Sequence, residues 1–163
     1  MKKSPVCTIA LSVGTLLLPF CTVVPASYAQ RINAVQANSE LVVEIDGLKN
    51  QKGQVCLSLF SSSKGFPSNG NQAIRSQCAK ITNDTPRISF NNLRAGSYAV
   101  AVLHDANSDN QLNRNAFGIP TEGFGFSRNP AIRAGAPKFS EAAVVVAGPN
   151  TSLQVQMKYL FGN

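Results

Sequence analysis

Leu153-Gln154-Val155-Gln156-Met157-Lys158-Tyr159, close to the C-terminus, is the stretch that decides the fold class. Apolar and polar side chains alternate along it, as they do on a β-strand with one buried face and one face in water. A helix would need apolar residues three and four positions apart, and no segment after residue 30 keeps that spacing over ten or more positions. The pattern therefore predicts a half-buried strand in an antiparallel sheet.

The same two-residue period recurs upstream in the chain. Apolar residues occupy every second position of four further runs, at 41–45, 55–59, 88–90 and 98–102, and shorter strands are expected around 78–81 and 142–146. Gly, Pro and Asn clusters typical of turns separate these runs. Strands at this spacing predict an all-β fold, a single antiparallel β-sandwich of six or seven strands in two sheets.

Composition excludes several other classes of protein. Among the 163 residues only 14% are charged, well below the roughly 25% of average soluble proteins. This argues against a solvated helical bundle and against a disordered chain of one charge sign. The chain has one histidine, which rules out any metal site built from several histidines.

The N-terminal segment has the pattern of an export signal. A basic start at residues 2–3 precedes an apolar run at 6–24, and small residues at 26–29 form a cleavage site. These three parts predict a signal peptide over residues 1–29 and a secreted or periplasmic protein. Two alternatives remain open: an uncleaved membrane anchor, and a lipoprotein acylated at Cys21.

The expected mature chain is one domain with a short leader. Residues 30–39 are polar without an apolar period and predict a flexible N-terminal leader. Residues 40–160 then form the β-sandwich domain. No second apolar stretch approaches the length that spans a bilayer, so we expect no transmembrane segment after cleavage.

Cysteine usage follows from the predicted cleavage. Cys7 and Cys21 leave with the signal peptide, so Cys56 and Cys78 remain. Two cysteines in an exported domain usually form a disulfide, which would contribute about 3 kcal/mol on the chain-entropy model. The alternative, two reduced thiols with a catalytic or metal-binding role, stays open.

The segment from about Asp105 to Ser140 is too long for a structureless connection and predicts one long ordered loop. It opens with oxygen-bearing side chains at alternate positions, which resembles the start of a calcium loop. The candidate ligands are Asp105, Asn107, Asp109, Gln111 and Asn113. Two carboxylates predict a weak Ca²⁺ site; alternatively, the Asp and Asn side chains only cap their own backbone turns.

The rest of this loop is rich in phenylalanine and glycine. Phe117, Phe124, Phe126 and Phe139 are expected to form a small satellite core beneath it, because phenylalanine is more often buried than used for recognition. The alternative is a ligand-facing cluster with Glu122 and Arg128, which flank the Gly-Phe-Gly-Phe motif and are placed to pair across it. A recognition loop would leave some of Phe117, Phe124 and Phe126 exposed, whereas a structural loop would bury them all.

Several of these motifs resemble one protein family. They are Phe90–Val100, Val100–Asn107, Gly118–Ser127 and Ala136–Ala142, and the likeness covers about residues 41–159. Together they are similar to the secreted domain-of-unknown-function family 2141 (DUF2141). The resemblance implies an exported prealbumin-like or immunoglobulin-like β-sandwich with no established activity. The family's acidic loop reads Asp-x-Asn-x-Asn/Asp-Gly with a later Asp; this chain has Asn110 in place of the Gly and Asn113 in place of the acid.

Enzymatic and nucleic-acid functions are poorly supported by the sequence. His104 stands beside Asp105, but neighbouring residues on a strand point to opposite faces, so a hydrolase using His104 is the least favoured alternative. The isoelectric point is about 9.5. Basic residues are nevertheless scattered, without interleaved aromatic residues, and no nucleic-acid partner is expected.

The sequence thus predicts a non-enzymatic, exported binding or accessory module. Its variable surface would be the 105–140 loop, because loops on rigid scaffolds carry recognition. A mild positive charge favours an anionic cell-surface polymer or another envelope protein as partner. The alternative is a structural envelope protein with no discrete ligand.

Overall fold

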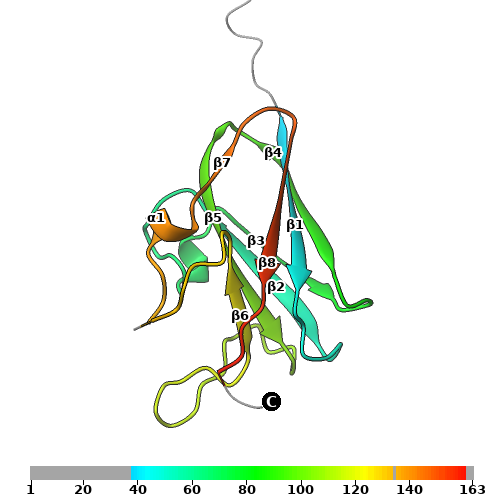
Figure 1. The fold of residues 1–163 in the computed structure, drawn as a ribbon, viewed down its shortest axis with the longest axis vertical. Helices are drawn as coiled ribbons and strands as arrows, with labels where there is room; N and C mark the ends of the chain where they lie inside the picture. Colours follow the sequence, from blue (N-terminus) through cyan, green and yellow to red (C-terminus); the bar gives the residue numbers. More distant parts are fainter. Residues whose placement is uncertain (1–37, 134, 161–163) are drawn as a thin grey trace, which may run out of the picture. The chain divides into compact units, whose positions relative to one another are not determined.

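The computed structural model describes residues 38–133 and 135–160, which are mostly β-strand. The predicted signal peptide at 1–29 and nearly all of the leader lie outside the described residues. Figure 1 shows the chain coloured along its length. The first strand begins at Ser39, which is fully buried, one residue before the expected start of the domain.

Eight strands and two short helical turns make up the described residues. The strands are β1 (Ser39–Asp46), β2 (Gln54–Phe60), β3 (Arg75–Lys80), β4 (Arg87–Leu93), β5 (Gly96–Asp105), β6 (Gly123–Phe126), β7 (Val144–Val146) and β8 (Asn150–Gln156). The helical turns are the 3₁₀ helix η3 (Gly70–Gln72) and α1 (Phe139–Ala142).

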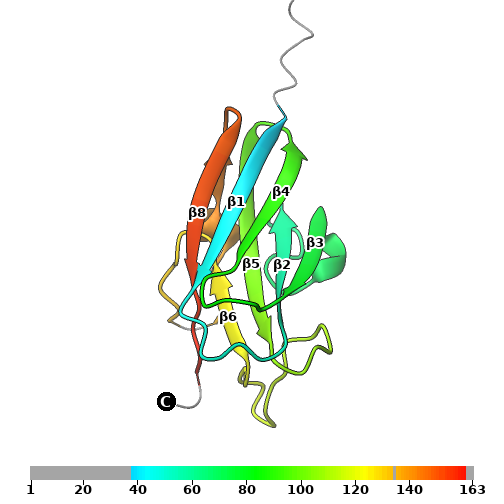
Figure 2. The same cartoon turned by 90° about the vertical axis from the view of Figure 1, so that its right-hand side faces the viewer.

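The strands form two sheets, as predicted for an all-β sandwich. One sheet has the order β4-β1-β8. The other has the order β3-β2-β5-β6, and β7 pairs with β5 as its fifth strand. Figure 2 shows β8, β1 and β4 side by side, with β6, β5, β2 and β3 behind them in that order.

The expectation of a purely antiparallel sandwich is wrong for one pair. β8 lies parallel to β1, with Leu41 opposite Thr151 and Ile45 opposite Val155. Alternating polarity reports that one face of a strand is buried, and it carries no information on the direction of the neighbouring strand. Val155 and Met157 are buried, as the alternation indicated.

A second correction concerns the 105–140 segment, which is not one loop. β6 divides it and pairs antiparallel with β5. All four residues of β6 are buried, so the segment has no polar–apolar alternation, and its glycines are unfavourable in strands. Neither feature is typical of a strand sequence, which explains why the described residues contain eight strands where six or seven were expected.

The main core fills the space between the sheets. Leu41, Val43 and Ile45 of β1 face Val55, Leu57 and Leu59 of β2, and all six are fully buried. Each such side chain contributes about 1.5–3 kcal/mol relative to exposure. The predicted two-residue period thus identified the residues that hold the sheets together.

A smaller apolar cluster lies on the outer face of the five-stranded sheet. Its members are Ala99, Phe124, Phe126 and Ala142, with the partly buried Phe66, Ala101, Ile132 and Phe139 packed against them. This is the expected satellite core for Phe124, Phe126 and Phe139. Phe117 lies outside it and is 88% exposed.

Candidate functional site

The outer face of the five-stranded sheet changes from polar to apolar across its strands. Leu103 of β5 points to this face, because its neighbours in the strand point into the main core. It lies opposite Cys56 on β2 and Phe124 on β6. Two positions earlier, Ala101 lies opposite Ser58 and Phe126. The strand register therefore lays an apolar floor over β5 and β6 and a more polar floor over β2.

One end of this face is closed by aromatic side chains. Phe66 packs edge-on against Phe60, with ring centroids 5.4 Å apart, and against Phe126 and Phe139, each at 6.0 Å. Phe60 points to the outer face opposite Ala99 and is fully buried. These contacts seal the start of β5 beneath the 61–74 connection and α1.

The other end of the face is left open as a groove of about 700 Å³. Ala101, Leu103, Phe124 and Phe126 line its apolar floor, beside Cys56 and Ser58 of β2. Three segments form its walls, at 67–70, at 110–114 and at 132–133 with 135–136, together with Pro120 and Leu160. Its volume lies within the range of small-molecule sites, and its lining is mixed, with polar as well as apolar residues.

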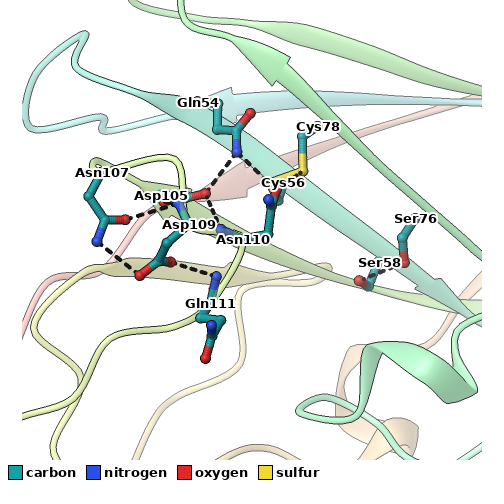
Figure 3. The surroundings of a disulfide bond; sticks show 10 residues. All are labelled: Gln54, Cys56, Ser58, Ser76, Cys78, Asp105, Asn107, Asp109, Asn110 and Gln111. Atoms are coloured by element: carbon teal, nitrogen blue, oxygen red, sulfur yellow. Dashed lines mark hydrogen bonds between the residues drawn. A yellow bond between two sulfur atoms is a disulfide. The ribbon is translucent and has the colours of Figure 1, made fainter.

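The predicted disulfide is confirmed, and it borders the groove. Cys56 on β2 and Cys78 on β3 lie directly opposite each other, with their Cα atoms 4.0 Å apart. Figure 3 shows that the bond stands beside the 105–111 loop. The Oδ1 atom of Asn110 lies 3.5 Å from Sγ of Cys78 and 3.8 Å from Sγ of Cys56. The disulfide thus ties the edge strand β3 to the sheet where this loop packs.

Asp105, the first candidate calcium ligand, organises the loop that follows it. Its fully buried carboxylate accepts hydrogen bonds from the backbone N–H groups of Asp109 at 3.1 Å and Asn110 at 2.9 Å. Nε2 of Gln54 donates a third bond at 2.8 Å. Ser108 and Asn110 adopt positive φ angles of 62° and 63° within this turn. Asp105 therefore has the capping role that the sequence left open beside calcium binding.

The exposed carboxylate of Asp109 accepts hydrogen bonds from the remaining candidate ligands. Its Oδ2 atom lies 2.9 Å from Nδ2 of Asn107 and 3.0 Å from Nδ2 of Asn113. The backbone N–H of Gln111 donates to Oδ1 at 2.8 Å. These hydrogen bonds, that of Asn113 first, lower the pKa of Asp109 below its ordinary value of 3.8. Three candidate side chains thus meet at one point, while Gln111 takes part through its backbone.

Glu122 and Arg128 make contacts other than the pair that sequence spacing suggested. Oε1 of Glu122 accepts from the backbone N–H of Ala106, and Oε2 accepts from that of Asn113, both at 3.0 Å. Nη1 of Arg128 lies 3.5 Å from the carbonyl oxygen of Ala143. Glu122 therefore connects the 105–113 loop to the start of β6, and Arg128 contacts the segment after α1.

Phe117 stands at the tip of a short, well-bonded turn. Oδ1 of Asn115 accepts from the backbone N–H groups of Phe117 and Ile119, both at 3.0 Å. A bridge between Arg114 and Pro120 closes the base of this turn. The turn presents Phe117 to solvent, while its base lines the groove.

His104 and Asp105 point to opposite sides of β5, as expected for neighbours on a strand. Nε2 of His104 donates to the carbonyl oxygen of Lys52 at 2.9 Å, and Nδ1 accepts from the hydroxyl of Tyr159 at 2.6 Å. The backbone N–H of Lys49 donates to the same hydroxyl at 3.1 Å. Both ring nitrogens are thus occupied, in a contact that no spacing in the sequence indicated.

Two further observations apply to residues 38–133 and 135–160. Within these ranges, no three His, Cys, Asp or Glu side chains gather closely enough to hold a metal ion. Within the same ranges, no helix has the length and apolar character needed to cross a membrane.

Comparison with known proteins gives one match. No curated protein and no solved structure matches the chain. A family model described as "Uncharacterized protein conserved in bacteria" matches residues 43–154, from β1 into β8. The match includes both cysteines of the disulfide, the 105–113 loop and the strands that form the groove floor. The chain therefore belongs to this family of uncharacterised bacterial proteins, DUF2141.

Proposed function

We propose that this protein is an exported, non-enzymatic binding module that holds an apolar ligand in the groove on the outer face of its five-stranded sheet. The observation that carries the proposal is the groove itself, about 700 Å³ with Leu103, Phe124 and Phe126 on its floor. Concave sites of this size and character are where proteins hold small molecules. The export signal predicted at residues 1–29 supports a role outside the cytoplasm.

The uneven covering of the outer face favours binding over a purely structural role. A face used only for stability is best covered along its whole length, because buried apolar area is the main stabilising term. Here Phe66 packs over the fully buried Phe60 at one end, and the other end stays open between three chain segments. Phe117 also remains exposed, as expected of a recognition loop rather than of a structural one.

The groove lining supports binding rather than catalysis. Its ionisable side chains among the described residues are Arg114 and Arg133, and its only cysteine is in the disulfide. Neither arginine serves readily as a general base or a nucleophile, because guanidinium stays protonated in proteins. His104, the residue of the enzyme alternative, is buried and bonded on both ring nitrogens.

A neutral fluorescent probe, N-phenyl-1-naphthylamine, tests this proposal. It should bind the purified protein with a rise in fluorescence, and Leu103→Gln should weaken binding about tenfold by placing an amide on the apolar floor. Ile74→Gln is the matched control, because Ile74 is 48% exposed and does not line the groove. Absent binding, or equal loss in both variants, would refute the groove as a ligand site.

A weak calcium site is a second candidate function, favoured by the meeting of three side chains at Asp109. Rotation about the last side-chain bond of an Asn exchanges the positions of its amide oxygen and nitrogen. Rotation of the amides of Asn107 and Asn113 would turn two oxygens toward the same carboxylate. Oxygen ligands of this kind suit Ca²⁺, and few charged ligands give a weak site. Asp105 would act here by shaping the loop, not as a ligand.

A further inference from the structure

Two arginines from different walls border the apolar groove. Arg114 lies on the 110–114 wall at the base of the Phe117 turn, and Arg133 lies on the wall formed by residues 132–133 and 135–136. No acidic side chain is among the described residues that line the groove. The apolar floor is therefore bordered by positive charge that no carboxylate of the lining balances.

The two guanidinium groups have unused hydrogen-bonding capacity. Arg114 donates one bond from Nη1 to the carbonyl oxygen of Gly118, at 2.8 Å. This contact uses one of five N–H donors and orients the group. Arg133 makes no hydrogen bond or ion pair with any other described residue. Guanidinium binds carboxylates through paired hydrogen bonds, so both groups suit a planar anionic headgroup.

We propose that the ligand is an elongated apolar molecule ending in a carboxylate, the chemistry of a fatty acid, whose headgroup is bound by Arg114 and Arg133. This inference rests on the proposed groove function and adds the class of ligand. The floor of Leu103, Phe124 and Phe126 contacts the hydrocarbon chain. A charged polymer would leave this apolar floor unused, which is why a single amphiphile fits the groove better.

A pair of matched probes separates the headgroup from the chain. cis-Parinaric acid, a fluorescent fatty acid, and its uncharged methyl ester are titrated into the full mature protein at the same ionic strength. The acid should bind about tenfold more tightly than the ester, because the ester lacks the charge that the arginines bind. The advantage should shrink as salt concentration rises.

Substitution of the arginines tests which residues are responsible. In Arg114→Gln and in Arg133→Gln, affinity for the acid should fall about tenfold, as expected for loss of a charged hydrogen bond. Affinity for the ester should not change. Arg94→Gln is the matched control, because Arg94 is an exposed residue between β4 and β5 and does not line the groove. It should bind both probes like the unmodified protein.

The outcomes distinguish this inference from the proposed function. Equal affinity for acid and ester, unaffected by either arginine substitution, would overturn the carboxylate assignment and leave the apolar groove standing. If neither probe bound, the groove function itself would fall. A third outcome is that the acid binds more tightly than the ester, yet loses as much affinity in Arg94→Gln as in Arg114→Gln. That result would attribute the preference to the net charge of the protein, and it would also overturn the assignment.

Discussion

Nδ1 of His104 lies 2.6 Å from the hydroxyl of Tyr159, although 55 residues separate the two in the chain. Tyr159 follows β8, the edge strand of the three-stranded sheet, whereas His104 lies on β5 in the other sheet. A backbone bridge between Phe124 and Lys158 runs beside this contact. The sheets are thus joined along one side by polar contacts as well as by the shared core.

Gly123 makes room for this junction. A Cβ atom at this position would lie 2.4 Å from a ring carbon of Tyr159, closer than any real contact. The glycine at the start of β6 therefore lets the Tyr159 ring reach His104. The same glycine weakens the strand signal in the sequence, which links the packing of the C-terminal segment to the failure to predict β6.

Tyr159→Phe should destabilise the protein by about 1–3 kcal/mol, because it leaves the buried Nδ1 of His104 without a hydrogen-bond partner. Urea unfolding of the two proteins measures the difference. Tyr98→Phe is a suitable control, since it removes a tyrosine hydroxyl that donates to the carbonyl oxygen of Arg94 and has no buried ring nitrogen as partner. Equal stability of Tyr159→Phe and the unmodified protein would contradict the role assigned to this contact.

Alkaline pH should weaken the same junction. Burial raises the pKa of Tyr159 above its ordinary value of 10.0, while the hydrogen bond from Lys49 opposes the shift. In the unfolded chain this tyrosine ionises near pH 10, so the unfolded state releases its proton first as pH rises. Ionisation of Tyr159 should therefore leave the free energy of unfolding unchanged below about pH 10. Above that pH the free energy of unfolding should fall as the pH rises toward the folded-state pKa. Ultraviolet titration of the unmodified protein should show a tyrosine that ionises at high pH and is absent from the titration of Tyr159→Phe. Curves of identical shape for the two proteins would contradict the shift.

Reduction of the Cys56–Cys78 bond should lower stability by about 3 kcal/mol, because the bond restricts the unfolded chain over a loop of 22 residues. Thermal unfolding with and without reductant measures the effect. The variant carrying both Cys56→Ser and Cys78→Ser should unfold like the reduced protein and should not respond to reductant. A melting temperature of the unmodified protein that reductant leaves unchanged would count against the bond.

Calcium in the millimolar range should raise the melting temperature by about 4 °C if the loop binds it, because a ligand that binds only the folded state stabilises it. Asp109→Asn should abolish this rise, since it removes the charged ligand at the centre of the site. Magnesium at the same concentration is the control ion. A rise that persists in Asp109→Asn, or none in the unmodified protein, would exclude this site.

Export predicts a processed N-terminus. Expressed as the full chain in a bacterial host, the protein should accumulate outside the cytoplasm and begin at Gln30, because cleavage follows the small residues at 26–29. N-terminal sequencing and intact-mass measurement check both points. Retention of Met1 in a membrane fraction would favour the uncleaved anchor, and a lipid-modified Cys21 would favour the lipoprotein alternative.

Residues whose burial follows a regular alternation along the chain could be identified from the sequence. Alternation at Leu41–Ile45 and at Val55–Leu59 predicted the buried faces, because successive side chains of a strand point to opposite sides whatever strand lies next to it. The pairing of Cys56 with Cys78 followed from the expected export and the small number of cysteines. The absence of polar–apolar alternation in Gly123–Phe126, where all four residues are buried, left β6 unpredicted.

The amino-acid sequence by itself determined an all-β chain in two sheets, the buried faces of its alternating strands, its disulfide and its family. Only the tertiary structure decided that β8 runs parallel to β1, that Tyr159 meets His104, and that Arg114 and Arg133 border one groove. The pattern of polar and apolar residues indicates which residues are buried. It does not indicate which strand or loop buries them, because the hydrophobic effect does not depend on the identity or orientation of the neighbour. Which strands become neighbours, and which loops meet over their faces, depends on contacts between residues far apart in the chain, and these leave no spacing in the sequence to read.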